Sequence, residues 1–129
     1  MGTQELQIRG RIAAGLGKAG GNVRQSAVAL RRALGILDVY PGTLNVLLDA
    51  DFEAPPWAPI VVDGLGERRQ PFHLYPAAIS GQRAWVARSL SQLEISDNVL
   101  EIIAERSLRD ALTLLDGDEV VIELLGPDS

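Results

Sequence analysis

A short segment occurs twice in this chain of 129 residues, and the repeat limits the folds that the chain can adopt. Residues 30–38, LRRALGILD, match residues 108–116, LRDALTLLD, at six of nine positions. Each copy has the composition of a short helix and is followed by an apolar segment typical of a strand. Two such units predict a small barrel with two similar, pseudo-two-fold halves. Chance similarity between two helix-forming segments remains the alternative.

The pattern of apolar residues predicts that most of the chain forms strands. Residues 6–14 and 43–48 alternate apolar and polar side chains, as in a half-buried strand. Turn signals separate further short strands, and Pro76 indicates a bulge or an edge in one of them. The expected strands lie at residues 6–14, 43–48, 59–62, 72–79, 83–88 and 119–125.

Two short helices are expected between these strands. Asn22, with Gln25 three residues later, is typical of a helix start, and Gly35 is typical of the end of that helix. Ser107 and Asp110 have the same spacing at the start of the second repeat copy, which predicts a second capped helix.

Composition excludes several classes of function. The chain has no cysteine and a single histidine, His73, which excludes disulfides, Cys-type zinc sites and His clusters. A net charge of −5 argues against general binding to nucleic acid. The sequence lacks an apolar run of transmembrane length or a signal peptide, so we expect one domain over residues 1–129, located in the cytoplasm and away from membranes.

Three segments contain residues suited to chemistry, and each also has a purely structural interpretation. GLGKAGG, residues 15–21, could hold phosphates with backbone N–H groups, or it could be only a turn. Thr43 and Asn45 project from one strand face, about 7 Å apart along the strand, where their oxygens could ligate a hard cation or simply face solvent. Glu101 with Arg106 and Arg109 could bind a polyphosphate and orient a hydroxyl, or form surface ion pairs.

In their order along the chain, GRIAAGLGKAGG, YPGTLNVLLD, EIIAERSLRDAL and LLDGDEVVIEL resemble the archaeal CTP-dependent riboflavin kinases. YPGTLN is the most specific of these motifs. The resemblance implies a mainly β protein with short helices, built as a six-stranded cradle-loop barrel. It also implies a kinase that moves a phosphoryl group from CTP to riboflavin and gives FMN and CDP.

The resemblance also assigns roles to individual residues. It implies that Thr43 and Asn45 ligate Mg²⁺, and that Glu101 is the catalytic residue that holds the flavin near its ribityl end. Leu93 stands where the family usually has a threonine that contacts the flavin. The implied nucleotide-binding residues are Gly15, Leu16, Gly17, Lys18, Ala19, Gly20, Arg106, Ser107, Leu108 and Arg109.

These residues leave two other classes of function open. The Leu93 departure fits a non-catalytic relative that binds a nucleotide or flavin without transferring phosphate. The segment LLDGDEVVIEL also resembles small DNA-binding barrels, although the acidic charge and the intact YPGTLN argue against that class. The leading expectation is a monomeric enzyme whose partners are CTP and riboflavin rather than nucleic acid.

Overall fold

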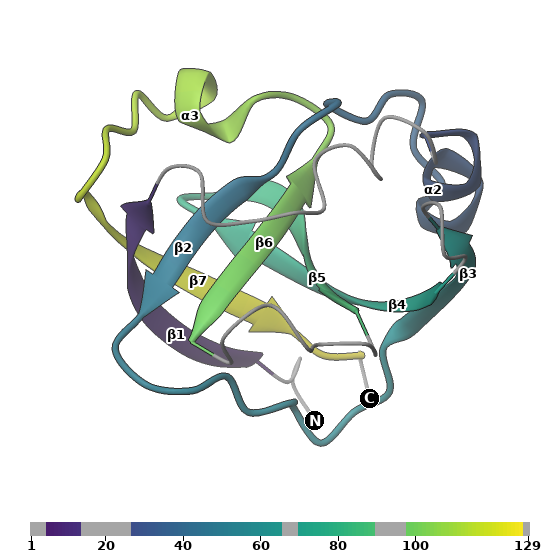
Figure 1. Cartoon of the computed structure of the whole chain (residues 1–129), viewed down its shortest axis with the longest axis horizontal. Coiled ribbons are helices and arrows are strands. Elements are labelled where there is room, and N and C mark those ends of the chain that lie inside the picture. Colours follow the sequence, from purple (N-terminus) through teal and green to yellow (C-terminus); the bar gives the residue numbers. More distant parts are fainter. Residues whose placement is uncertain (1–4, 14–26, 66–69, 90–97, 128–129) are drawn as a thin grey trace.

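The computed structural model describes residues 5–13, 27–65, 70–89 and 98–127, which form a small β-barrel with two short helices (Figure 1). All six expected strands are present within a few residues of their predicted bounds. The elements are β1 Glu5–Ala13, α2 Ala27–Leu34, β2 Leu44–Leu48, β3 Ile60–Leu65, β4 Gln70–Ile79, β5 Gln82–Ser89, β6 Val99–Ala104, α3 Leu108–Ala111 and β7 Glu119–Leu125.

The barrel closes because β4 pairs with two strands besides β5. The sheet order is β3-β4-β5-β6-β2-β1-β7, and β7 pairs again with β4, so six antiparallel strands form a closed ring with β3 outside it. On its edge opposite β5, β4 pairs with β3 up to Leu74 and with β7 from Ala77 onward. Pro76 lies in the gap between these pairings, where a missing N–H costs no ladder bond. The position is thus unpaired on one side, although β4 is not the edge strand that the sequence offered as one explanation of this proline.

The inside of the barrel is filled by alternate residues of all six strands. One cluster of buried side chains contains a residue from each of these strands: Ile12, Val46, Ala77, Val86, Leu100 and Ile122. Leu108 of α3 joins the same cluster and therefore closes one end of the barrel. This arrangement explains the period of two in the sequence of β1, β2 and β7.

A second cluster lies on the outer face of β4, β5 and β6. Leu30 of α2 is fully buried there against a group that includes Val62, Phe72, Trp85 and Ile103. In Figure 1, α2 and β3 lie together at the side of the barrel, over the ends of β4 and β5. These three strands are consequently covered on both faces.

Strand β6 was not expected from the sequence as a separate strand. All six of its residues are buried, because Leu100 and Ile102 face the interior while Ile103 belongs to the outer cluster. A strand covered on both faces carries a nearly continuous apolar run instead of an alternating one. The period-two criterion therefore failed at VLEIIA for a physical reason.

The two repeat copies form the same helix end. In the first copy the Ile36 N–H donates to the Arg31 carbonyl at 3.1 Å, and in the second the Leu114 N–H donates to the Arg109 carbonyl at 2.8 Å. The residue before each donor has a left-handed backbone, with φ of 66° at Gly35 and 54° at Thr113. Both are Schellman-type ends, so the similarity of the copies is structural.

Local signals for the helices are confirmed where the structure describes them. The first helix ends at Leu34, directly before Gly35, as expected. Ser107 caps the second helix, because its hydroxyl oxygen accepts a hydrogen bond from the Asp110 N–H at 3.3 Å. The expected helix start at Asn22 and Gln25 lies outside the described residues.

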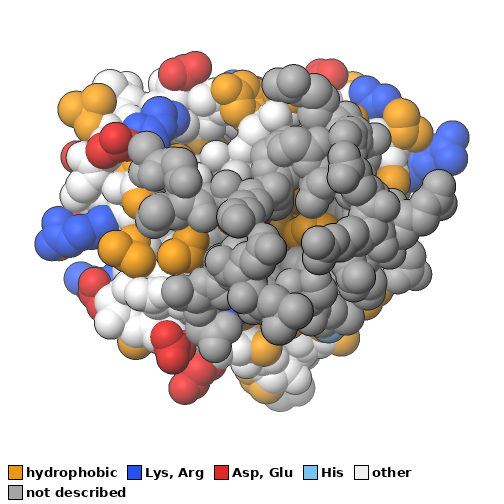
Figure 2. Space-filling view, viewed as in Figure 1, with side chains coloured by type: hydrophobic (Ala, Val, Ile, Leu, Met, Phe, Trp, Pro, Cys, Tyr) orange, Lys and Arg blue, Asp and Glu red, His pale blue; other side chains and the backbone are white. Residues whose placement is uncertain are grey.

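Charged side chains of both signs surround the face of the molecule in Figure 2. Acidic and basic groups are interspersed along its left edge, and the basic groups at its right edge lie over α2, which carries Arg31 and Arg32. This face offers no continuous basic surface among its described residues. None of the helices described here has the length and apolar character that crossing a membrane requires.

Candidate functional site

Asn45 and Glu101 are brought together by the pairing of β2 with β6. They are direct partners in the antiparallel register, so both side chains leave the same, outer face of the barrel with Cβ atoms about 5 Å apart. Their neighbours on the next strands are both alanines, Ala13 on β1 and Ala87 on β5. An amide and a carboxylate thus stand side by side in a row that has an alanine at either end.

Thr43 lies next to Asn45 as the strand alternation predicts. The Thr43 hydroxyl donates to the Asn45 side-chain carbonyl oxygen at 3.4 Å, and both side chains are half-buried. Adjacent ligands of an octahedral Mg²⁺ at about 2.1 Å would be about 3 Å apart. The two neutral oxygens therefore need to approach only slightly to share one cation, and their chemistry fits Mg²⁺.

The described residues supply no other concentrated metal site. None of their His, Cys, Asp and Glu side chains form a group of three that could hold a cation. A Mg²⁺ ion on Thr43 and Asn45 would complete its shell with water and substrate phosphate oxygens, as this ion commonly does. The donor set would thus suit a hard cation that takes its remaining ligands from elsewhere.

Glu101 is the single buried charged side chain among the described residues. It is 4% exposed, and it makes interactions with its surroundings. Burial of a carboxylate is costly unless the group is paired or used, so buried acids are frequent at functional sites. Its place opposite Asn45 puts this buried carboxylate directly beside one of the two candidate metal ligands.

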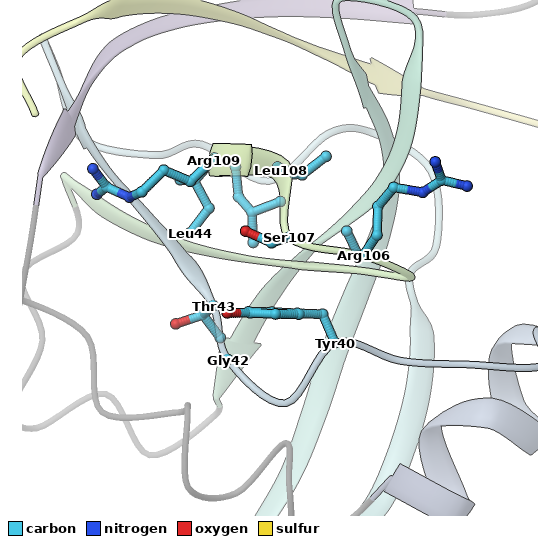
Figure 3. Close-up of a pocket in the computed structure, with 10 residues that line it drawn as sticks. Tyr40, Gly42, Thr43, Leu44, Arg106, Ser107, Leu108 and Arg109 are labelled. Atoms are coloured by element: carbon cyan, nitrogen blue, oxygen red, sulfur yellow. The ribbon is translucent and has the colours of Figure 1, made fainter. Parts of the chain in front are cut away.

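A cavity of about 100 Å³ opens between the start of β2 and the start of α3 (Figure 3). Thr43 belongs both to this cavity and to the row on the outer face of the barrel, and therefore connects the two. The remaining lining residues come from three segments of the chain: Tyr40, Gly42 and Leu44; Ile102 and Ala104; Arg106, Ser107, Leu108 and Arg109.

The second of the two segments expected to bind the nucleotide lines this cavity with all four of its residues, Arg106, Ser107, Leu108 and Arg109. Ser107 caps α3, and Leu108 is buried below it. Figure 3 shows the guanidinium groups of Arg106 and Arg109 pointing to opposite sides, away from the cavity centre. Arg109 forms an ion pair with Asp116 at 2.8 Å, which is the surface ion pair that the sequence left open as an alternative.

Part of the expected site cannot be placed. The glycine-rich segment from Gly15 to Gly20, including Lys18, and Leu93 all lie outside the described residues. Tyr40 is a cavity residue that the sequence interpretation missed, although an aromatic residue directly before a Pro-Gly turn and the Thr43 motif was a usable signal.

Comparison with known proteins identifies the family. Residues 12–124 match the family model CTP-dep_RFKase, which is described as domain of unknown function DUF120. The chain belongs to this family. The match includes β2, β6 and the cavity, so every described site residue lies within the family domain.

Curated riboflavin kinases are similar to this member of the family over most of its length. The protein from Methanocella arvoryzae is 36% identical over 124 residues, which are 91% of this chain and 56% of the relative. The protein from Pyrococcus abyssi is 37% identical, over 92% of this chain and 58% of the relative. This chain thus spans little more than half of those two proteins. The riboflavin kinase from Aeropyrum pernix is 35% identical, over 93% of this chain and 96% of the relative.

Proposed function

We propose that this protein is a riboflavin kinase that transfers a phosphoryl group from CTP to riboflavin with Mg²⁺ and gives FMN and CDP. The observation that carries the proposal is the register of β2 and β6, which puts the Asn45 amide directly beside the buried Glu101 carboxylate. The family match and the name that the curated relatives share support the same reaction. A monomeric state and a cytoplasmic location belong to the same proposal.

Thr43 and Asn45 would hold the metal through their side-chain oxygens. Bound Mg²⁺ would neutralise charge on the phosphate oxygens and help to orient them. The first turn of α3, with Ser107 to Arg109, would contact the nucleotide from the other side of the cavity. Phosphoryl transfer depends mainly on such positioning and charge neutralisation.

Glu101 would position the terminal hydroxyl of riboflavin. The hydroxyl oxygen forms a bond to the γ-phosphorus while the bond from that phosphorus to the bridging oxygen of CTP breaks, and CDP leaves. The hydroxyl proton passes to the Glu101 carboxylate or to water. Since Asn45 is the direct neighbour of Glu101, the acceptor would lie next to the metal-bound phosphate.

The test is an incubation of the purified protein with riboflavin and Mg²⁺, with CTP in one sample and ATP in another. We expect FMN, measured by chromatography, from CTP and little from ATP. FMN from ATP alone would contradict the donor. A protein that binds CDP but makes no FMN with either donor would be a non-catalytic relative, and the Leu93 departure would be the first position to examine.

A further inference from the structure

Tyr40 forms one wall of the cavity beside Thr43 and has no role in the proposal above. Its backbone N–H donates to the Ala104 carbonyl at 2.9 Å, which ties the segment before β2 to the end of β6. Its ring lies on Gly42, since a Cβ atom at that position would be 3.1 Å from Cε2 of the ring. Glycine at position 42 therefore gives the ring space to lie against the backbone.

The ring is held in place although much of it is open. Tyr40 is 42% exposed, although its backbone is anchored to β6 and its ring contacts Gly42. Figure 3 shows the ring edge-on below Ser107, extending from Tyr40 toward Thr43. One face of the ring is thus directed toward the start of α3, on the other side of the cavity.

Three of the other lining residues are large, buried and aliphatic, while polar groups come from Thr43, Arg106, Ser107 and Arg109. Leu44, Ile102 and Leu108 line it and are each at most 6% exposed. An aromatic face opposite buried aliphatic side chains suits a flat, weakly polar ring, because such a ring gains stacking and loses little hydration. A phosphate group would not be favoured against these three aliphatic side chains.

The size and position of the cavity indicate which ring would occupy it. Its volume of about 100 Å³ is similar to that of the ~150 Å³ engineered cavity that holds one benzene molecule. Thr43 borders the same cavity. Because Thr43 is a proposed ligand of the Mg²⁺ that would bind the phosphates, the phosphate chain would lie at this edge of the cavity. In a pyrimidine nucleotide, a single-ring base is joined through the ribose to a phosphate chain. The base of such a nucleotide therefore fits this cavity.

We propose that Tyr40 stacks on the base of the donor nucleotide and thereby positions its phosphates at Thr43 and Asn45. This inference rests on the proposed function and adds a binding residue to it. Stacking of a base on an aromatic side chain changes affinity by about 5- to 150-fold. Removal of the ring should therefore weaken binding of the nucleoside part and leave binding of a phosphate chain without a base unchanged.

The experiment measures binding by calorimetry with Mg²⁺ present, using CDP, ADP and inorganic tripolyphosphate as probes. The proteins are the wild type, Tyr40→Ala, Tyr40→Phe and the control Leu37→Ala, which changes an exposed side chain of the same segment outside the cavity. We expect Tyr40→Ala to raise the Kd of CDP at least 10-fold and to leave that of tripolyphosphate within 2-fold. Tyr40→Phe, which keeps the ring, should stay within 3-fold for both, and Leu37→Ala should match the wild type.

Three results would overturn the proposal: an unchanged Kd of CDP in Tyr40→Ala, an equal loss for CDP and tripolyphosphate, or a loss in Tyr40→Phe as large as in Tyr40→Ala. Thermal unfolding of each variant shows whether the barrel is intact. Failure of the proposed function is a separate result. If the wild type binds ADP in place of CDP, the donor is wrong and Tyr40 is tested with ADP, whereas normal CDP binding without FMN formation contradicts only the transfer reaction.

Discussion

The two copies of the repeated segment end their helices in the same way, but they serve different parts of the molecule. In the first copy, Leu30 of α2 packs on the outer cluster at the side of the barrel. In the second copy, the equivalent Leu108 of α3 packs on the interior cluster and lines the cavity. Similar local sequences thus end their helices in the same way, although the two helices pack on different faces of the barrel. Only residues 105–107 separate β6 from α3, whereas residues 14–26 separate β1 from α2.

The strands that follow the copies also differ. Strand β2 follows the first copy and pairs with β1 and β6, and β7 follows the second copy and pairs with β1 and β4. Both strands therefore border β1, one on each side. Asn45 of β2 meets Thr43, the residue directly before this strand, so the candidate metal site follows the first copy. The helix start at the cavity belongs to the second copy.

The largest effect is expected from a change at the candidate metal site, which follows the first copy. Asn45→Ala removes one of the two proposed oxygen ligands of Mg²⁺. We therefore expect Mg²⁺-dependent FMN formation to fall by about 100-fold or more, which exceeds the loss typical of residues that only hold the metal ligands in place. Asn45→Asp keeps an oxygen and should retain much of the activity. Thermal unfolding should be nearly unchanged in both. Full activity in Asn45→Ala would remove this residue from the metal site.

The equivalent leucines test whether the second helix alone serves the cavity. Leu30→Ala and Leu108→Ala each remove a buried side chain and should lower the free energy of unfolding by about 2–5 kcal/mol. Under conditions where both variants are folded, only Leu108→Ala should raise the Kd of CDP, because only Leu108 lines the cavity. Denaturant unfolding and calorimetry measure the two effects. Equal losses of affinity in the two variants would show that the copies do not differ in this way.

Exchange of the left-handed residues tests whether the helix ends are equivalent. Gly35→Thr places a β-branched residue at φ of 66° with open space around it, and should cost about 1–2 kcal/mol through backbone strain alone. Thr113→Gly relieves the same strain at φ of 54° and should stabilise by up to about 1 kcal/mol, with glycine's extra chain entropy reducing the gain. Thermal unfolding should shift by a few degrees in opposite directions. Shifts of the same sign would contradict the equivalence.

The smallest effect is expected at the exposed leucines of the two copies. Leu37 is 89% exposed and its equivalent Leu115 is 67% exposed, so neither side chain contributes much to the folded core. Leu37→Ser and Leu115→Ser should each change the free energy of unfolding by no more than about 0.5 kcal/mol. Denaturant unfolding is the measurement. A larger loss of unfolding free energy in either variant would contradict the exposure of that leucine and indicate that its side chain makes a stabilising contact.

The sequence by itself determined the features that depend on local chemistry. Alternation located most strands, Ser107 and Gly35 indicated the cap and the end of the two helices, and the YPGTLN motif indicated Thr43 and Asn45 as neighbours on one strand face. Each of these depends on hydrogen bonds or side-chain directions within a few residues, which a sequence pattern can specify.

Tertiary structure decided the features that join distant segments. Closure of the barrel through β4 and β7, the burial of β6 on both faces, and the register that sets Glu101 beside Asn45 all depend on pairings between strands far apart in the chain. The cavity with Tyr40 depends on the approach of residues 40–44 to the start of α3. A sequence pattern of period two gives the face on which a residue lies, but it does not state which strand is the neighbour, because register is set by packing across the sheet.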